Sequence, residues 1–154
     1  MVSDPAVTVL YLQPIQLLIL LRALGLLVWR WKRISALLAR VVLQGRESLQ
    51  RRAKALLHTW LGAYYAIQLQ SQGVDHIHAH HGYFGSWIAM TAARLLDVGF
   101  SITLHGSDLL LDAAYLDTKL KNCQFCVTIS EYNRRYILGR VPGIDSGKIL
   151  VSRL

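Results

Sequence analysis

Four of the six histidines stand close together, in the stretch DHIHAHHGYFGSW at residues 75–87. An imidazole ring can ligate a metal, transfer a proton or hydrogen-bond to a neighbour. In an extended strand His76, His78 and His80 share one face at a spacing of about 6.6 Å, and His81 points to the other face. Strand alternation therefore predicts that His81 lies apart from the other three.

Three interpretations of this histidine stretch are open: a metal site, a strand whose histidines make structural hydrogen bonds, or a strand end that faces a ligand. Two of the histidines could share a zinc ion only with a third ligand, for which His105 and Asp108 are the candidates. No nearby Cys or Glu supplies one. We expect no metal here and favour a ligand-facing strand end.

Two further apolar runs also end in polar residues. FSITL is followed by HGSD, in which Gly106 lets a ligand approach the backbone and a helix start offers free N–H groups to a phosphate. CVTIS ends in Ser130, a natural N-cap for a helix starting at Glu131. Capping alone is the simplest interpretation of Ser130, and Asn133 and Arg134 suit the surface better than a ligand contact.

The two cysteines, Cys123 and Cys126, are too few for a secreted disulfide framework and predict a reducing, cytoplasmic setting. Their CxxC spacing falls where a helix leads into a strand, whereas a thioredoxin-like pair follows a strand. No second pair is present to complete a zinc site. We expect Cys126 to be a buried small apolar residue and Cys123 to have no role.

The elements that position these residues alternate in type. Short apolar runs at 75–81, 99–105, 125–130 and 148–154 alternate with helical stretches at 86–97, 109–122 and 131–139. This order predicts an α/β fold with βαβ units and a parallel, Rossmann-like sheet covered on both faces. Ligands of such sheets bind at the carboxyl ends of the strands, so the three polar strand ends are expected on one rim.

The first third of the chain differs in charge and pattern. Residues 1–57 contain nine basic and two acidic residues, and the remainder contains eight and seven, so this segment accounts for most of the net charge of +8. A short β-prone run at 7–12 precedes a long helix at 15–42, interrupted at most by Gly25, and a second helix at 47–70. We expect two parts, a basic amphipathic helical segment at 1–72 and a βαβ part at 73–154.

The basic residues of the first long helix fall on one half of a helical wheel, and leucines fall on the other. This pattern favours a helix lying in a membrane interface over a packing helix or a transmembrane span, because the apolar stretch is short and Arg22 interrupts it. It suits anionic lipid better than a DNA groove, so no nucleic-acid partner is expected. The predicted membrane contacts are Arg22, Trp29, Arg30, Trp31, Arg33 and Arg40.

Residues 73–154 resemble the amino-terminal domain of glycosyltransferase family 4. The similarity is carried by DHIHAHHGYFGSWIAMTAARLLDVGFSITLHGSDLLLD, CVTISEYNRRYIL and KILVSRL, in this order. The branch that is most similar builds colanic acid and related exopolysaccharides. Residues 15–70 resemble the membrane-associating helices of that branch with much less specificity.

The resemblance implies one half of a GT-B fold and a retaining transfer of a sugar from a nucleotide-diphosphate donor to a glycan or lipid-linked acceptor. It implies no metal requirement and no cofactor. His105 and Asp108 match the family's HGxD motif and are the catalytic candidates. The residues that match substrate-facing positions are His80, His81, Gly82, Gly106, Ser130, Glu131 and Asn133.

Two parts of the family pattern have no counterpart here: the first strand with its polar loop, and the carboxy-terminal domain that holds the donor. We therefore expect an incomplete domain that is inactive alone, located in the cytoplasm and peripheral on the inner face of the plasma membrane. The alternatives are a non-catalytic membrane-surface or interaction module and, with less support, a histidine metal site.

Overall fold

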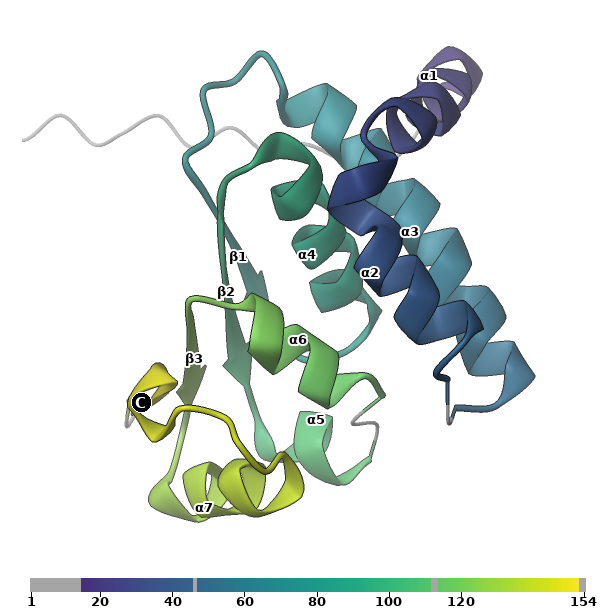
Figure 1. The fold of residues 1–154 in the computed structure, drawn as a ribbon. Helices are drawn as coiled ribbons and strands as arrows, with labels where there is room; N and C mark the ends of the chain where they lie inside the picture. Colours follow the sequence, from purple (N-terminus) through teal and green to yellow (C-terminus); the bar gives the residue numbers. More distant parts are fainter. Residues whose placement is uncertain (1–14, 46, 112–113, 153–154) are drawn as a thin grey trace, which may run out of the picture.

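The computed structural model describes residues 15–45, 47–111 and 114–152, and its centre is a four-stranded, all-parallel sheet (Figure 1). The strands pair in the order of the chain, which confirms the predicted α/β class. They are β1 (His76–His80), β2 (Gly99–Leu104), β3 (Phe125–Thr128) and β4 (Ile149–Val151). The β-prone run at 7–12 lies outside the described residues.

Helices connect the strands: α4 (Phe84–Leu96), α5 (Gly106–Leu110), α6 (Leu116–Asn122) and α7 (Glu131–Arg140), and a short 3-10 turn, η1 (Ser146–Lys148), precedes β4. The single helix predicted at 109–122 is wrong, because α5 and α6 are separate. Tyr115 has a left-handed backbone, with φ of +54°, immediately before α6. A residue in this conformation cannot continue a right-handed helix, so the chain changes direction there.

The hydrophobic core lies on one face of the sheet. Strand register places Ala79 beside Ile102 and Ile102 beside Cys126, and these residues are buried in one cluster with α4 and α6. The opposite face consists of His76, His78, His80, Ser101, Thr103, Phe125, Val127 and Leu150, and none of them belongs to that cluster. The expected covering of both faces is therefore wrong for the described residues. Strands in chain order with right-handed crossovers place their helices on the same side.

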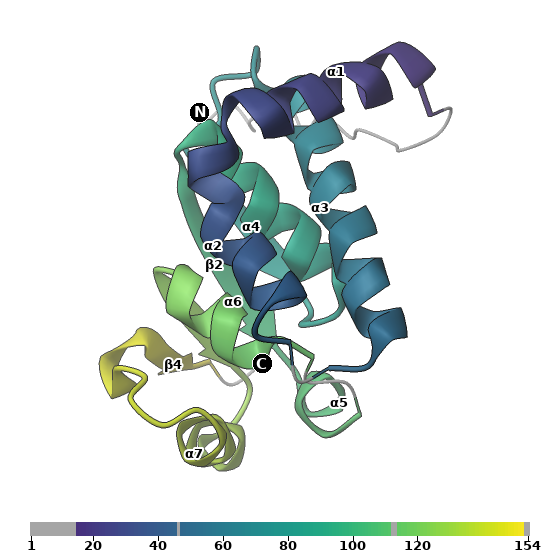
Figure 2. The same cartoon turned by 45° about the vertical axis from the view of Figure 1, so that its right-hand side comes forward.

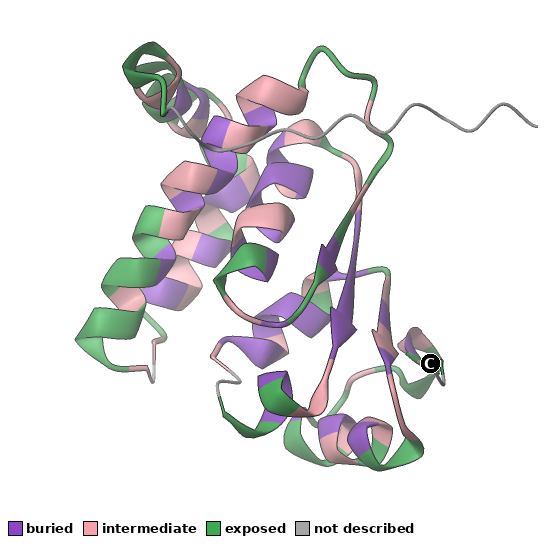
Figure 3. Ribbon diagram, turned by 180° about the vertical axis from the view of Figure 1, so that it is seen from behind, coloured by how far each residue is buried: buried purple, intermediate pink, exposed green. Residues whose placement is uncertain are grey.

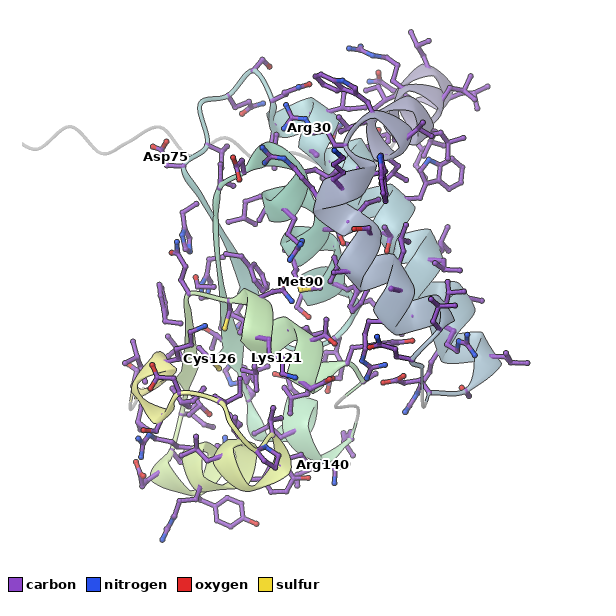
Figure 4. All side chains as sticks on the ribbon, viewed as in Figure 1. Arg30, Asp75, Met90, Lys121, Cys126 and Arg140 are labelled. Carbon is purple, nitrogen blue, oxygen red and sulfur yellow. The ribbon has the colours of Figure 1, made fainter. Side chains whose placement is uncertain are left out.

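The helical segment before the sheet contains α1 (Leu17–Trp29), α2 (Trp31–Val42) and α3 (Leu49–Leu69). The prediction of one helix over 15–42 is wrong, because the chain bends at Arg30 and not at Gly25. The bend lets α1 cross α3 while α2 packs on both α3 and α4 (Figure 2). Arg30 lies at this joint (Figure 4). Its guanidinium donates a hydrogen bond to the Leu95 carbonyl at the end of α4.

Helix α3 packs closely on α4. Gly62 faces Thr91 at a distance that leaves no room for a side chain, and the Trp87 indole N–H donates to the Thr59 hydroxyl at 2.9 Å. Leu37 and Val41 from α2 belong to the same core as the sheet. Figure 3 shows the result, with buried residues where the helices meet and exposed ones on the outer turns of α1 and α3. The helical segment and the sheet thus share a core.

Candidate functional site

Three histidines converge at the carboxyl ends of β1 and β2. His80 is the last residue of β1, His81 follows it, and His105 follows β2. One ring nitrogen from each lies within 4.8 Å of the others, and the Nε2 atoms of His80 and His105 are 3.1 Å apart. We call these three residues the histidine triad. His80 and His81 are exposed and His105 is half-buried, so a ligand can reach the rings.

The separation of His81 from His80 that strand alternation predicts is wrong. His81 has a left-handed backbone, with φ of +84°, and its N–H donates to the Thr103 carbonyl at 3.0 Å. The chain therefore leaves the extended conformation directly after His80, and alternation no longer applies. The His81 ring centroid lies 4.6 Å from that of His80 and 4.7 Å from that of His105.

Asp108 contacts two residues of the triad, His105 and His81. Its side chain is buried, its Oδ2 accepts a hydrogen bond from the His105 backbone N–H at 2.7 Å, and the same oxygen lies 3.5 Å from Nδ1 of His81. The other oxygen, Oδ1, is buried with no hydrogen-bond partner among the described groups. Asp108 therefore ties the turn after β2 to the turn after β1.

The turn after β1 needs a glycine and a buried lysine. A Cβ added at Gly82 would lie 2.6 Å from Cδ2 of Leu104 and 3.1 Å from Cβ of Asp108, so a larger residue would require both side chains to shift. Lys119 of α6 is almost fully buried and donates from Nζ to the Gly82 and Tyr83 carbonyls. Sequence reasoning missed Lys119, because a lysine in a short polar helix looks solvent-facing until the packing of α6 is known.

The other residues predicted to face a substrate lie at the start of α5 and at the start of α7. The space beside Gly106 is open, since a Cβ there would meet nothing within 4 Å. The Ser130 hydroxyl accepts from the Asn133 N–H at 3.2 Å, which confirms the predicted N-cap of α7. Glu131 pairs with Arg134 at 3.0 Å. Asn133 is buried, and its Nδ2 has no hydrogen-bond partner among the described residues, so it is not the surface residue expected.

His76 and His78 are held by structural hydrogen bonds. A ring nitrogen of His76 lies 2.6 Å from the Ser101 hydroxyl, and the two nitrogens of His78 lie 2.7 Å and 2.9 Å from the hydroxyls of Ser101 and Thr103. Burial, and then the neighbouring His76 and His80, lowers the pKa of His78. His76 and His78 therefore fit the interpretation of histidines that make structural hydrogen bonds. Only the histidine triad lies where a ligand could bind.

A small apolar pocket is lined by Gly82 and Tyr83, the two residues that follow His81 in the chain. His58 of α3 lies in its wall and stacks on Phe84 with ring centroids 4.5 Å apart. Burial, followed by the charges of Lys54 and Lys119, lowers the pKa of His58. Sequence reasoning did not single out His58, because it is an isolated histidine within a helix.

Of the six residues predicted to contact a membrane, three are arginines that bind partners within the protein and three are exposed. Arg33 pairs with Asp97 at 2.9 Å, and Arg40 forms a two-pronged pair with Glu47 at 2.9 and 3.0 Å. Arg30 is also bound within the protein, as described above. Arg22, Trp29 and Trp31 are exposed. Within the described ranges, no helix has the length and hydropathy needed to cross a bilayer.

Both cysteines are free and buried. Burial raises the pKa of the Cys123 thiol to about 11 and that of the Cys126 thiol to about 12. Both are therefore neutral at ordinary pH and unsuited to redox or nucleophilic chemistry. The prediction for Cys126 is confirmed, and Cys123, for which no role is expected, packs into the core as well.

Comparison with known proteins identifies the family. A family model for Glycosyltransferase Family 4 matches residues 19–151, which include both the helical segment and the sheet. No curated protein and no solved structure matches the chain. The match covers most of the chain and contains every residue of the triad together with Asp108 and Lys119. The chain belongs to glycosyltransferase family 4.

Proposed function

We propose that this chain forms the acceptor-side half of a retaining GT-B glycosyltransferase of the colanic-acid type. It takes part in the transfer of a sugar from a nucleotide-diphosphate donor to a glycan or lipid-linked acceptor during cell-surface polysaccharide biosynthesis. The observation that carries the proposal is the convergence of the histidine triad at two strand ends, in a chain of this family. The carboxyl edge of a parallel sheet is where such folds bind ligands.

The side chains divide the work by their exposure. His105 is open to a ligand and can donate or accept one hydrogen bond at a sugar hydroxyl or a phosphate oxygen, so it is the catalytic residue. Asp108 is buried and reaches substrate only through His105 and His81, so we assign it a positioning role in place of the predicted catalytic one. His80, His81 and Gly82 form the acceptor side, and Ser130, Glu131 and Asn133 the border along α7. The reaction needs no metal or other cofactor.

Turnover requires a second half of the cleft. His80 and His81 are exposed, so water reaches the triad freely. Glycosyl transfer to an acceptor competes with hydrolysis unless water is excluded from the reacting sugar. A donor-binding domain that closes over this rim would exclude water and hold the nucleotide.

The test is binding mapped residue by residue. Nucleotide-diphosphate sugars and soluble glycan acceptors are titrated into the labelled chain while amide chemical shifts are recorded by nuclear magnetic resonance. We expect shifts at residues 80–82 and 105–108, no turnover, and loss of the shifts in His105→Ala but not in His76→Ala. Shifts confined to other regions would refute the site, and turnover by this chain would refute the need for a second half.

A second function, membrane-surface binding, is favoured by the outer side of the helical segment. Val28, Trp29 and Trp31 have exposed fractions of 75%, 72% and 57%, at the joint of α1 and α2. Exposed tryptophans suit the headgroup region of a bilayer. We propose that this surface holds the protein on the cytoplasmic face of the plasma membrane.

Flotation with vesicles containing anionic lipid tests membrane binding. The Trp29→Ser/Trp31→Ser variant should stay with the soluble fraction. Leu150→Ser removes an exposed apolar side chain from the face of the sheet that does not contact the core. This control should float with the vesicles as the unaltered chain does. Equal flotation of all three proteins would contradict this surface as the contact.

A further inference from the structure

We propose that His80, His81 and His105 bind an exchangeable zinc ion. This inference concerns a ligand other than the sugar substrates, and it departs from the expectation of no metal. That expectation depended on His81 pointing away from His80. The structure brings a ring nitrogen from each of the three histidines within 4.8 Å of the other two.

The geometry suits a tetrahedral ion. Zinc–nitrogen bonds of 2.0–2.1 Å place the ligand atoms of a tetrahedral site about 3.3 Å apart. The Nε2 atoms of His80 and His105 are already 3.1 Å apart. One ring nitrogen from each of the three residues lies within 4.8 Å of the other two, so small rotations of the rings complete the set. Three histidine ligands are a donor set that zinc accepts in proteins.

Asp108 supplies the partner that metal-bound histidines usually have. A ligating imidazole commonly turns its second nitrogen toward a carboxylate, which fixes the ring and increases its basicity. The buried Asp108 Oδ2 lies 3.5 Å from His81 Nδ1, and it also accepts a hydrogen bond from the backbone N–H of His105. Its Oδ1 is buried with no hydrogen-bond partner among the described residues, and a cation held by the three rings would offset the charge of this carboxylate.

The site has three protein ligands and an open side. Structural zinc sites have four protein ligands, whereas three ligands leave a position for water or another small molecule. Because His80 and His81 are exposed, the ion can enter and leave from solvent. One consequence rests on the proposed function: zinc uses the nitrogen lone pairs of His80 and His105 and therefore inhibits sugar binding at this rim.

Zinc binding is measured on the chain without any sugar. Tag-free, chelator-treated protein is titrated with zinc chloride by calorimetry, and with cobalt(II), whose visible spectrum reports tetrahedral nitrogen coordination. We expect one ion per chain. His81→Gln and His105→Gln should each weaken binding more than about 100-fold, and Asp108→Asn about 10- to 100-fold. As a control, His76→Gln removes a histidine of β1 that is not part of the triad. This variant should bind zinc as tightly as the unaltered chain does.

Circular dichroism of every variant shows whether the fold persists. No binding by the unaltered chain, or equal loss in His76→Gln and His105→Gln, would overturn the zinc site. Zinc binding without any effect on the nucleotide-sugar shifts described above would leave the metal site standing and count against the role of His105 in substrate binding. The two proposals can therefore fail separately.

Discussion

Gly62 provides the sharpest test of how the helical segment is placed. A Cβ atom at this position would lie 2.6 Å from the Thr91 Cβ and 2.9 Å from the Ile88 carbonyl oxygen. Real Cβ atoms essentially never come within 3.0 Å of another heavy atom, and neither of these atoms is at the end of a flexible side chain. Gly62→Ala must therefore push α3 away from α4.

The expected cost follows from the packing of these helices. Overfilling a well-packed core destabilises a protein by about 1–3 kcal/mol, and alanine recovers about 0.5–1 kcal/mol of helix propensity over glycine. The overpacking term is the larger at this contact. At the middle of these two ranges the free energy of unfolding falls by about 1.2 kcal/mol, which lowers Tm by roughly 2–5 °C at about 2–4 °C per kcal/mol for a domain of this size.

Urea denaturation followed by circular dichroism measures this effect, with Gly25→Ala as the matched control. A Cβ at Gly25 of α1 would meet nothing within 4 Å, so the same substitution should raise the free energy of unfolding by about 0.5–1 kcal/mol. Opposite signs at the two glycines support the packed arrangement. If Gly62→Ala is as stabilising as Gly25→Ala, α3 does not pack on α4 and the helical segment lies elsewhere.

Three further predictions concern charge and titration. Arg40→Gln should lower the free energy of unfolding, measured by urea denaturation, by about 1–3 kcal/mol, because it removes the guanidinium that pairs with the half-buried Glu47. The control Arg22→Gln changes an exposed arginine and should alter this free energy by less than about 0.5 kcal/mol. Cys123 and Cys126 should resist a thiol reagent at pH 8 until urea unfolds the chain, because burial raises the pKa of each thiol to about 11 and about 12. Burial lowers the pKa of His58 below its ordinary 6.5, so below this pH the unfolded chain binds a proton that the folded chain does not. The free energy of unfolding should therefore decrease as the pH drops below 6.5. Urea denaturation at several pH values should show a smaller decrease for His58→Gln.

The strands could be predicted from the sequence because each is a short apolar run between polar turns. All four runs formed strands, and Ser130 caps α7 as expected. The break at Arg30 could not be predicted, because leucine and alanine on both sides favour an unbroken helix. It coincides with a contact across the fold, the hydrogen bond from Arg30 to the Leu95 carbonyl, which sequence periodicity does not reveal.

The site was only partly predictable for a similar reason. His80 and His105 follow from the rule that ligands bind at the carboxyl ends of parallel strands. The position of His81 depends on one left-handed residue, which no periodicity reveals. Lys119 lies far away in sequence, and nothing in its local pattern marks it as the residue that holds the turn after β1.

The left-handed backbone of His81 connects the stability of the fold to the geometry of the site. A residue other than glycine in this conformation costs about 1–2 kcal/mol, so neighbouring contacts must hold it. The His81 N–H bonds to β2, Gly82 fits against Leu104, and Lys119 fixes the next two carbonyls. If these contacts were lost, the chain could relax toward an extended strand, and His81 would move to the opposite face from His80. The surrounding core therefore keeps the three rings together, which is how strained residues persist at functional sites.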